Sequence, residues 1–206
     1  MGGGPGGTGG GPGGTGGGPG GTGGDAPSVA ARDDLAGVVD LFEWLTREEL
    51  SEALSELAFK QRAEVDGEAI AAAIDVAVAE YALVPAPPAA LSEAGGDGGR
   101  ATEPADPADG ADADAVALAV GPAAFPSLPA DAEDLPHILD VPERDVDRQA
   151  LSEAVVERLS ADAVAAIEAG DAERLEVLAD VTYDIEAWAP VDAGDIRERI
   201  VAELDG

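Results

Sequence analysis

One short pattern recurs four times along this chain and fixes where helices begin. An apolar residue is followed at once by Thr or Asp, and a second apolar residue stands four positions after that. The side-chain oxygen of Thr or Asp caps the free N–H groups of a first helical turn, while the two apolar residues pack together across the cap. Apolar residues at helical spacing follow each copy, so the sequence predicts a mainly α-helical fold. The four copies are Leu45-Thr46 with Leu50, Val65-Asp66 with Ile70, Val146-Asp147 with Leu151, and Val191-Asp192 with Ile196.

The apolar stripes set the extent of each helix. Gly170 is expected to end one helix, and Asp171 to cap the next. A further cap-like pattern at Leu159-Ser160 predicts a break inside a long helix. We therefore expect a small bundle of about six helices, and they lie near 35–45, 47–62, 67–82, 148–169, 172–181 and 193–204.

Two short segments have the character of strands instead. Apolar residues alternate with alanine over 115–120, which is typical of a strand, and 136–141 also reads as extended. If the two segments pair as a hairpin, they add a short two-stranded β element to the bundle.

Two low-complexity stretches divide the chain into parts. Residues 2–24 repeat Gly-Gly-Pro-Gly-Gly-Thr-Gly with a period of seven, and 85–114 is rich in proline, glycine and acidic residues. Neither stretch has the side chains that a core needs. We expect a disordered tail over 1–32, a three-helix part over 33–84, a disordered acidic insert over 85–114, and a mostly helical part over 115–206 that packs against 33–84.

The charge balance indicates the solvent. Acidic residues number 43 against 11 basic ones, for a net charge of -32, and Lys60 is the only lysine. Self-repulsion of this size opposes a compact state, whereas at molar salt the Debye length falls to about 3 Å. Alanine accounts for 43 residues, so the core is thinly apolar and gains from high salt. These features indicate the cytoplasm of an extremely halophilic archaeon.

Several functional classes are excluded by the residues themselves. Without cysteine there is no disulfide, catalytic thiolate or zinc-cysteine site. No apolar run of about 18 residues and no signal sequence is found, which predicts a soluble cytoplasmic protein without membrane contact. No phosphate loop, dinucleotide fingerprint, nucleophile elbow or EF-hand order is present. We therefore expect no cofactor, no metal, and no catalytic residue that can be named.

Three residues are the first place to look for a partner. Phe125 and Trp188 are flanked by prolines, and interfaces concentrate such aromatic residues, although packing inside a poor core is their commoner role. His137 is the only histidine and titrates near neutrality, but no nucleophile motif accompanies it. Phe125, His137 and Trp188 are therefore candidate partner contacts rather than catalytic groups.

A helix-turn-helix module over 33–82 is the sharpest alternative. Its recognition helix would be 67–82, which carries three acidic residues and no base, whereas duplex binding draws on Lys and Arg. Nucleic acid is therefore not the expected partner. A basic stripe along one face would reverse this view, and it would have to come from Arg47, Arg62, Arg144, Arg148 or Arg158.

Parts of this sequence resemble an uncharacterised family of haloarchaeal (halobacterial) proteins of unknown function. The resemblance is carried by 45–60, by Phe125-Pro126-Ser127-Leu128-Pro129 and by 186–192, and it spans about 38–204. It implies the same salt-loaded compartment and no residue role, since the family has no assigned activity. We expect a non-enzymatic regulator or adaptor that binds a macromolecular partner, most readily a protein. The alternatives are the DNA-binding regulator and an enzyme with an unrecognised carboxylate site.

Overall fold

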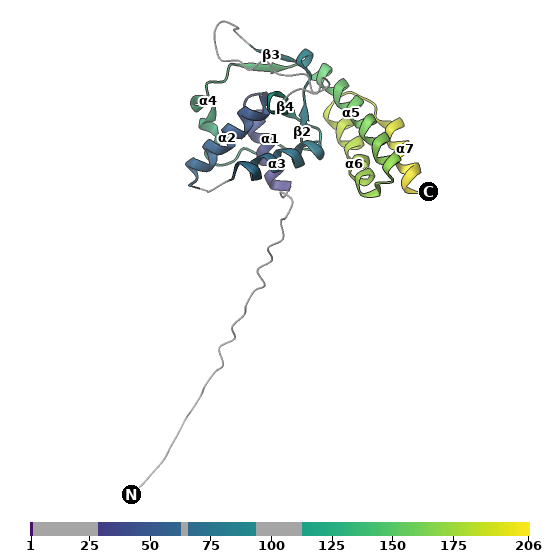
Figure 1. Ribbon diagram of the computed structural model, residues 1–206, viewed down its shortest axis with the longest axis horizontal. Coiled ribbons are helices and arrows are strands. Elements are labelled where there is room, and N and C mark those ends of the chain that lie inside the picture. The colour runs from purple at the N-terminus through teal and green to yellow at the C-terminus, as the bar shows by residue number, and fades with distance from the viewer. Residues whose placement is uncertain (2–28, 63–65, 94–112) are drawn as a thin grey trace.

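The computed structural model describes Met1 and residues 29–62, 66–93 and 113–206 (Figure 1). Of the tail predicted over 1–32, residues 2–28 lie outside the described residues, as does 94–112 of the predicted insert, whereas 29–32 belong to the first helix and the expectation of disorder fails there. The mainly helical fold is confirmed, with seven α-helices in the described ranges. They are α1 (Val29–Asp40), α2 (Arg47–Lys60), α3 (Gly67–Ala79), α4 (Leu135–Ile138), α5 (Arg148–Ala169), α6 (Ala172–Trp188) and α7 (Gly194–Leu204).

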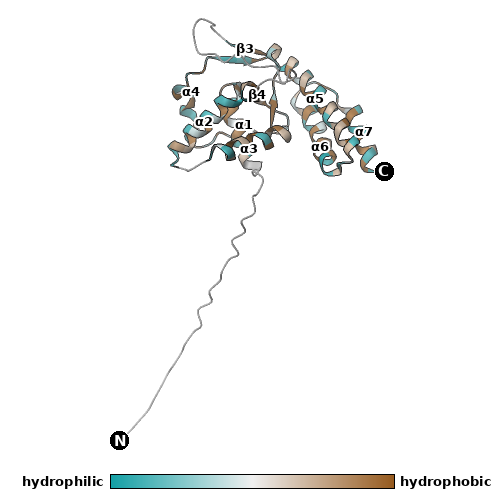
Figure 2. Cartoon of the chain, viewed as in Figure 1, coloured by the Kyte–Doolittle hydropathy of each residue, from teal (hydrophilic) through white to brown (hydrophobic). Residues whose placement is uncertain are grey.

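The predicted caps place most helix starts correctly. Thr46 forms a complete capping box with Glu49, and Asp66, Asp147 and Asp171 each accept a backbone N–H in the first turn of their helix. Gly170 ends α5 in the left-handed conformation, with φ of 64°. Polar and apolar residues alternate along the helices, as Figure 2 shows. Local side-chain chemistry is therefore enough to position these ends.

Four helix predictions need correction. The helix expected near 35–45 is α1, which ends at Asp40, because Glu43 has a positive φ of 65° and Trp44–Thr46 form a strand. The helix α5 does not break at Leu159-Ser160, because Leu159 is fully buried in a continuous apolar stripe. The helix α6 continues past 181 to Trp188, since Ile185 extends its buried face. The N-cap of α7 is Ala193 rather than Asp192, whose carboxylate instead accepts the N–H of Gly194 at 2.9 Å.

A three-stranded antiparallel sheet lies between two layers of helices (Figure 1). Side chains on one face of the sheet, among them Leu45, Leu83 and Leu118, join the core of α1, α2 and α3. Side chains on the other face, among them Trp44 and Val84, join the core of α5, α6 and α7. The period-two alternation of strands thus supplies both cores. The strands run in the order β1 (Trp44–Thr46), β4 (Ala117–Val120) and β2 (Leu83–Pro85).

The predicted hairpin between 115–120 and 136–141 is wrong. The first segment does contain β4, but both edges of β4 are taken by β1 and β2, with Leu118 opposite Leu45 and Pro85. The second segment is not a strand, because α4 begins at Leu135 with a proline in its first turn. Proline is well tolerated there because its missing N–H has no helical partner to lose.

The beginning of the predicted acidic insert is ordered. Residues 85–93 include the end of β2, a 3₁₀ turn at Pro88–Ala90 and the strand β3 (Leu91–Glu93), so the expectation of disorder from Pro85 onward fails for this stretch. The strand β3 pairs antiparallel with β5 (Arg144–Val146) as a second sheet. The small side chains of Ala86 and Ala90 are what allow this chain to enter the core beside α5.

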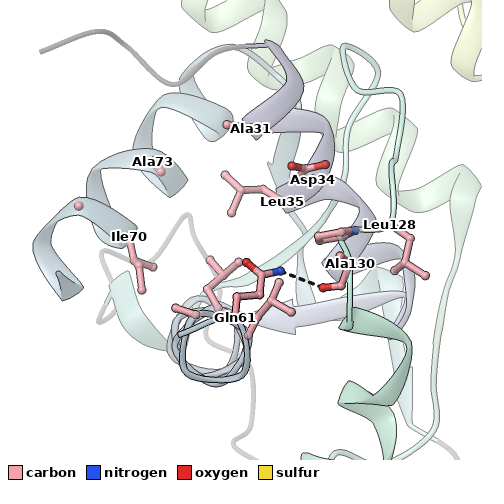
Figure 3. A pocket seen from close by; sticks show the side chains of 13 residues that line it. Ala31, Asp34, Leu35, Gln61, Ile70, Ala73, Leu128 and Ala130 are labelled. Atoms are coloured by element: carbon pink, nitrogen blue, oxygen red, sulfur yellow. Dashed lines mark hydrogen bonds between the residues drawn. The ribbon is translucent and has the colours of Figure 1, made fainter. Parts of the chain in front are cut away.

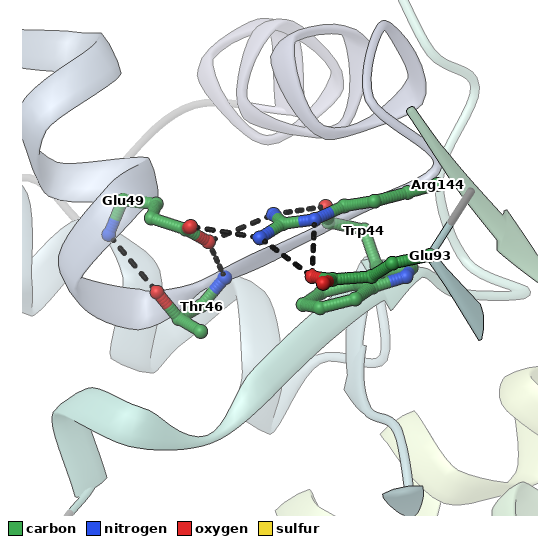
Figure 4. Close-up of polar contacts among 5 residues, drawn as sticks. All are labelled: Trp44, Thr46, Glu49, Glu93 and Arg144. Carbon is green, nitrogen blue, oxygen red and sulfur yellow. Dashed lines mark hydrogen bonds and ion pairs between the residues drawn. The ribbon is translucent and has the colours of Figure 1, made fainter. Parts of the chain in front are cut away.

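Arg144 connects the second sheet to the helical core (Figure 4). Its guanidinium is fully buried and lies 3.7 Å from the ring centroid of Trp44. It makes two 2.8 Å hydrogen bonds to the carboxylate of Glu49, and others to the Trp44 carbonyl at 3.1 Å and to Glu93 at 3.3 Å. The same Glu49 carboxylate accepts the N–H of Thr46 at 2.7 Å. The capping box of α2 is therefore also the anchor of this arginine.

Polar contacts join the end of α3 to the other helical layer. Arg158 donates to the Val78 carbonyl and Arg174 to the Ala79 carbonyl, both at 2.7 Å, so two arginines from α5 and α6 satisfy carbonyls at the C-terminus of α3. The hydroxyl of Tyr81 donates to Asp162 at 2.8 Å, and burial raises the pKa of this phenol. The two arginines place positive charge at the C-terminal end of the α3 dipole, which is favourable. Together with the Tyr81 hydrogen bond they fix the end of α3 against α5 and α6.

Gly121 lies where the chain leaves β4, and this position has no room for a side chain. A Cβ added there would lie 2.2 Å from the Tyr81 carbonyl oxygen and 2.9 Å from a methyl group of Val84. We expect Gly121→Ala to lower the free energy of unfolding by about 1–3 kcal/mol, measured by denaturant titration. Gly67→Ala is the control, since nothing lies within 4 Å of its added Cβ. Equal stability of the two variants would contradict this packing.

Candidate functional site

The structure places the three predicted contact residues in different parts of the molecule. Phe125 is 78% exposed, and its N–H donates to the Asp33 carboxylate beside α1 at 3.0 Å. His137 is exposed on α4, whose Leu135 belongs to the core of α1, α2 and α3. Trp188 is half-buried at the end of α6 and packs on the opposite core. The three residues therefore do not form one surface.

Trp188 lines one opening, of about 570 Å³, together with Arg148 and Val191. A second opening, with a mostly aliphatic lining, lies between α1, α2 and α3 (Figure 3). It is a groove of about 550 Å³, open to solvent, which we call the α1–α3 groove. Aliphatic side chains from all three helices line it, and the segment 128–130 forms one rim. The larger apolar lining residues are Leu35, Leu54, Leu57, Ile70 and Leu128.

Alanine creates the space in this groove. Five of its thirteen lining residues are alanine, and they stand on each of the three helices and on the rim. A methyl group fills little of the gap between packed helices, so an opening remains although Leu35, Leu57 and Ile70 are themselves buried, each 6% exposed. The groove is thus a consequence of the alanine-rich composition. Those alanines are Ala31, Ala58, Ala69, Ala73 and Ala130.

The rim of the groove is held in place by polar contacts with α2. Gln61 donates to the Ala130 carbonyl at 2.9 Å, as Figure 3 shows. Lys60 donates to the Asp131 carbonyl at 3.2 Å and pairs with Asp134 at 2.9 Å. The hydrogen bond and charge of Lys60 lower the pKa of the Asp134 carboxyl. The groove therefore has a preformed shape, which reduces the entropy lost on binding.

The rim also lies directly on α1. The N–H of Ser127 donates to the Asp33 carbonyl at 3.0 Å, and a Cβ added to Gly37 would stand 2.0 Å from the Ser127 carbonyl oxygen. Only glycine at 37 allows this approach. Phe125 and Leu128 are thus carried on a segment fixed to the helix, with Leu128 46% exposed at the groove.

Among the described residues that line the groove, Asp34 is the only charged one. It projects from α1 next to Leu35 (Figure 3) and is half-buried. Its neighbour Asp33 accepts the Phe125 N–H, whereas no hydrogen bond or ion pair to the Asp34 carboxylate is found within the described ranges. The groove therefore combines an apolar surface with one available negative charge.

Two other features bear on the predicted site classes. Within the ranges that the structure describes, no group of three or more His, Asp or Glu side chains is placed to hold a metal ion. Of the arginines considered for a basic stripe, Arg47 pairs with Asp75, Arg144 is buried on Glu49, and Arg158 binds the end of α3. These three cations are thus engaged within the chain.

A comparison with protein families matches residues 33–205 to a family model. The chain belongs to DUF7109, a family of unknown function. The expected membership of an uncharacterised family is thereby confirmed. The DUF7109 match includes both sheets and nearly all of the described helices, so every described lining residue of the groove except Ala31 lies inside the family region. No curated protein and no solved structure matches the chain.

Sequence reasoning missed the groove of this DUF7109 member. It assigned Leu54, Leu57 and Ile70 to core stripes, and the structure confirms that Leu57 and Ile70 are buried in the core, while all three also border the opening. The sequence did not single out Asp34, because one aspartate cannot be distinguished as functional among 43 acidic residues. The sequence signal that could have indicated the groove is the alanine-rich segment 69–73, because alanine side chains are too small to fill the space between packed helices. No helix in the described part of the chain is long and apolar enough to cross a membrane.

Proposed function

We propose that this chain is a non-enzymatic regulator or adaptor that binds a segment of a protein partner in the α1–α3 groove. The observation that carries the proposal is the preformed apolar opening, lined by three helices and a fixed rim. At this opening Leu128 is 46% exposed and Leu54 is partly exposed, and accessible apolar surface is typical of protein interaction sites. Its volume lies in the range that accommodates several aliphatic side chains or one small molecule.

The alternative DNA-binding function receives less support. The helix that would enter the major groove is α3, whose Ala69, Ile70 and Ala73 line the α1–α3 groove. Its exposed residues include Glu68, and its Asp75 holds Arg47 in an ion pair. Anionic side chains on a recognition helix oppose phosphate binding. These contacts favour a protein partner.

The proposed working environment is a cytoplasm loaded with salt, as in a halophilic archaeon. Two observations support this proposal. The net charge is -32, and arginines such as Arg144 and Arg197 form ion pairs within the chain. High salt weakens long-range attraction between exposed charges but strengthens apolar burial. Recognition through an apolar groove suits such a solvent.

Blocking the groove tests the proposal. Ala69 is exposed and lines the groove, whereas Ala72 is exposed on the same helix and does not. We expect Ala69→Trp to reduce recovery of a bound protein at least tenfold and Ala72→Trp to leave it unchanged, since an indole fills the opening. The measurement is a pull-down at the salt of the source cytoplasm, analysed for both protein and nucleic acid. Recovery of nucleic acid, or equal recovery of the same proteins by both variants, contradicts the proposal.

A further inference from the structure

We infer that the segment held by the α1–α3 groove is an amphipathic helix that carries a Lys or Arg to pair with Asp34. This inference rests on the proposed function and names the chemistry of the partner. Three observations carry it: the kind of surface that lines the groove, the available carboxylate of Asp34, and the composition of the segment that precedes α1.

The lining of the groove favours a helix over an extended peptide. Its walls are side chains of α1, α2 and α3, and it includes no strand edge. The rim carbonyl of Ala130 is already bonded to Gln61. An extended segment would therefore bury N–H and C=O groups without partners, whereas a helix satisfies its own backbone. An apolar helix face in a hydrophobic groove is also a recurrent mode of recognition.

The carboxylate of Asp34 calls for a cation on the partner. A purely apolar segment that covered the groove would remove water from this half-buried group and leave its charge unpaired, which is costly. A Lys or Arg beside the apolar anchors would instead form a charge-assisted hydrogen bond. Salt screens exposed pairs strongly, but a pair covered by the partner is screened much less.

The chain's own tail does not have this chemistry. Residues 2–28 lead directly into α1, yet they contain no Lys or Arg and no aliphatic side chain larger than alanine apart from proline. The occupant is therefore expected to be a segment of another protein.

A charge-swap experiment tests the pairing. The probes are two designed helical peptides with leucines spaced at i, i+3, i+4 and i+7, which differ only by Lys or Glu beside the leucines. Fluorescence anisotropy measures their binding to the full chain at working salt. We expect the Lys peptide to bind the native chain at least tenfold more tightly than the Glu peptide, and Asp34→Lys to reverse that preference. Asp40→Lys is the matched control, because Asp40 is exposed on the same helix and does not line the groove.

The outcomes separate the two proposals. If both peptides bind and Asp34→Lys or Asp34→Asn changes neither affinity, the pairing with Asp34 is overturned while the groove remains. If neither peptide binds, or if Ala69→Trp binds both as the native chain does, the groove itself is overturned as the site. Removal of residues 2–24 is expected to leave the affinity unchanged, and a gain would identify the tail as the occupant instead. Sedimentation at the same concentrations is expected to show no self-association that depends on Asp34, and such self-association would identify a second copy as the occupant.

Discussion

Replacing Arg144 by Met is expected to lower the free energy of unfolding by about 3–5 kcal/mol. The guanidinium is fully buried and satisfies Glu49, the Trp44 carbonyl and Glu93 at once. Its removal would leave the half-buried Glu49 carboxylate without its main counter-charge and uncover the face of Trp44. Denaturant unfolding at working salt measures the loss, and the far-ultraviolet circular dichroism spectrum reports whether the variant folds at all.

Controls distinguish a buried pair from a mere loss of charge. Arg148→Met removes the same charge from a side chain that is 62% exposed and whose nearest carboxylate oxygen lies 3.9 Å away, so a change below about 0.5 kcal/mol is expected. The double variant Arg144→Met with Glu49→Gln should recover part of the stability, because it no longer buries an unpaired carboxylate. A double variant as unstable as the single one would contradict this account.

Acidification should shrink the difference between the native chain and Arg144→Met. Burial alone would raise the pKa of Glu49, but the hydrogen bonds from Arg144 and Thr46 outweigh burial and lower it below the ordinary 4.5. A lowered folded-state pKa contributes stability that is present above the ordinary value and is lost as pH falls through the folded-state value. In the variant, Glu49 lacks Arg144 and gains from protonation. The two unfolding curves should therefore approach each other below about pH 4.5.

Removing salt is expected to unfold the whole protein. The chain has 43 acidic residues and a net charge of -32, and the Debye length grows from about 3 Å at 1 M salt to about 30 Å at 0.01 M. The core that must resist this repulsion contains many alanines, which bury little area each. After dialysis from molar KCl into millimolar buffer, the helical ellipticity and the cooperative melting transition should both be lost.

A comparison of KCl with sucrose distinguishes charge screening from strengthened apolar burial as the cause of refolding. Sucrose strengthens burial without screening charge, whereas KCl does both. We expect KCl to restore the ellipticity and sucrose to restore it only in part, because repulsion persists. A sharp melting transition that survives dialysis would contradict the proposed salt requirement and reopen the question of the cellular setting.

The sequence was most informative where structure is fixed locally. The helix α5 begins after the Asp147 cap and ends at Gly170, as predicted, because both signals act within one turn. The strands β1 and β2 were missed since each has only three residues and pairs with β4, whose Ala119 lies opposite Trp44 and Val84. The residues around Trp44 in the sequence do not indicate that its strand pairs with residues as distant as Ala119.

The candidate site was harder to predict for a related reason. A stripe such as Leu54 and Leu57 tells that one helix face is apolar, but not whether three such faces close completely. That depends on the volumes that meet in space, here the alanines opposite them. Arg144 was likewise assigned to a potential surface stripe, although its buried position follows from the pairing of β5 with β3. Contacts between distant segments decided both cases.

The middle position of β4 has a consequence for synthesis of the chain. The strands β1 and β2 never touch each other, and the strand that joins them is complete only at Val120. A nascent polypeptide that has emerged only to residue 93 therefore carries two solitary strands, each with an unsatisfied backbone edge and an apolar face awaiting cover. The helices α1, α2 and α3 can therefore pack on a complete sheet only after the residues of β4 have left the ribosome. We therefore expect the two helical layers to fold together once β4 is available, rather than one after the other.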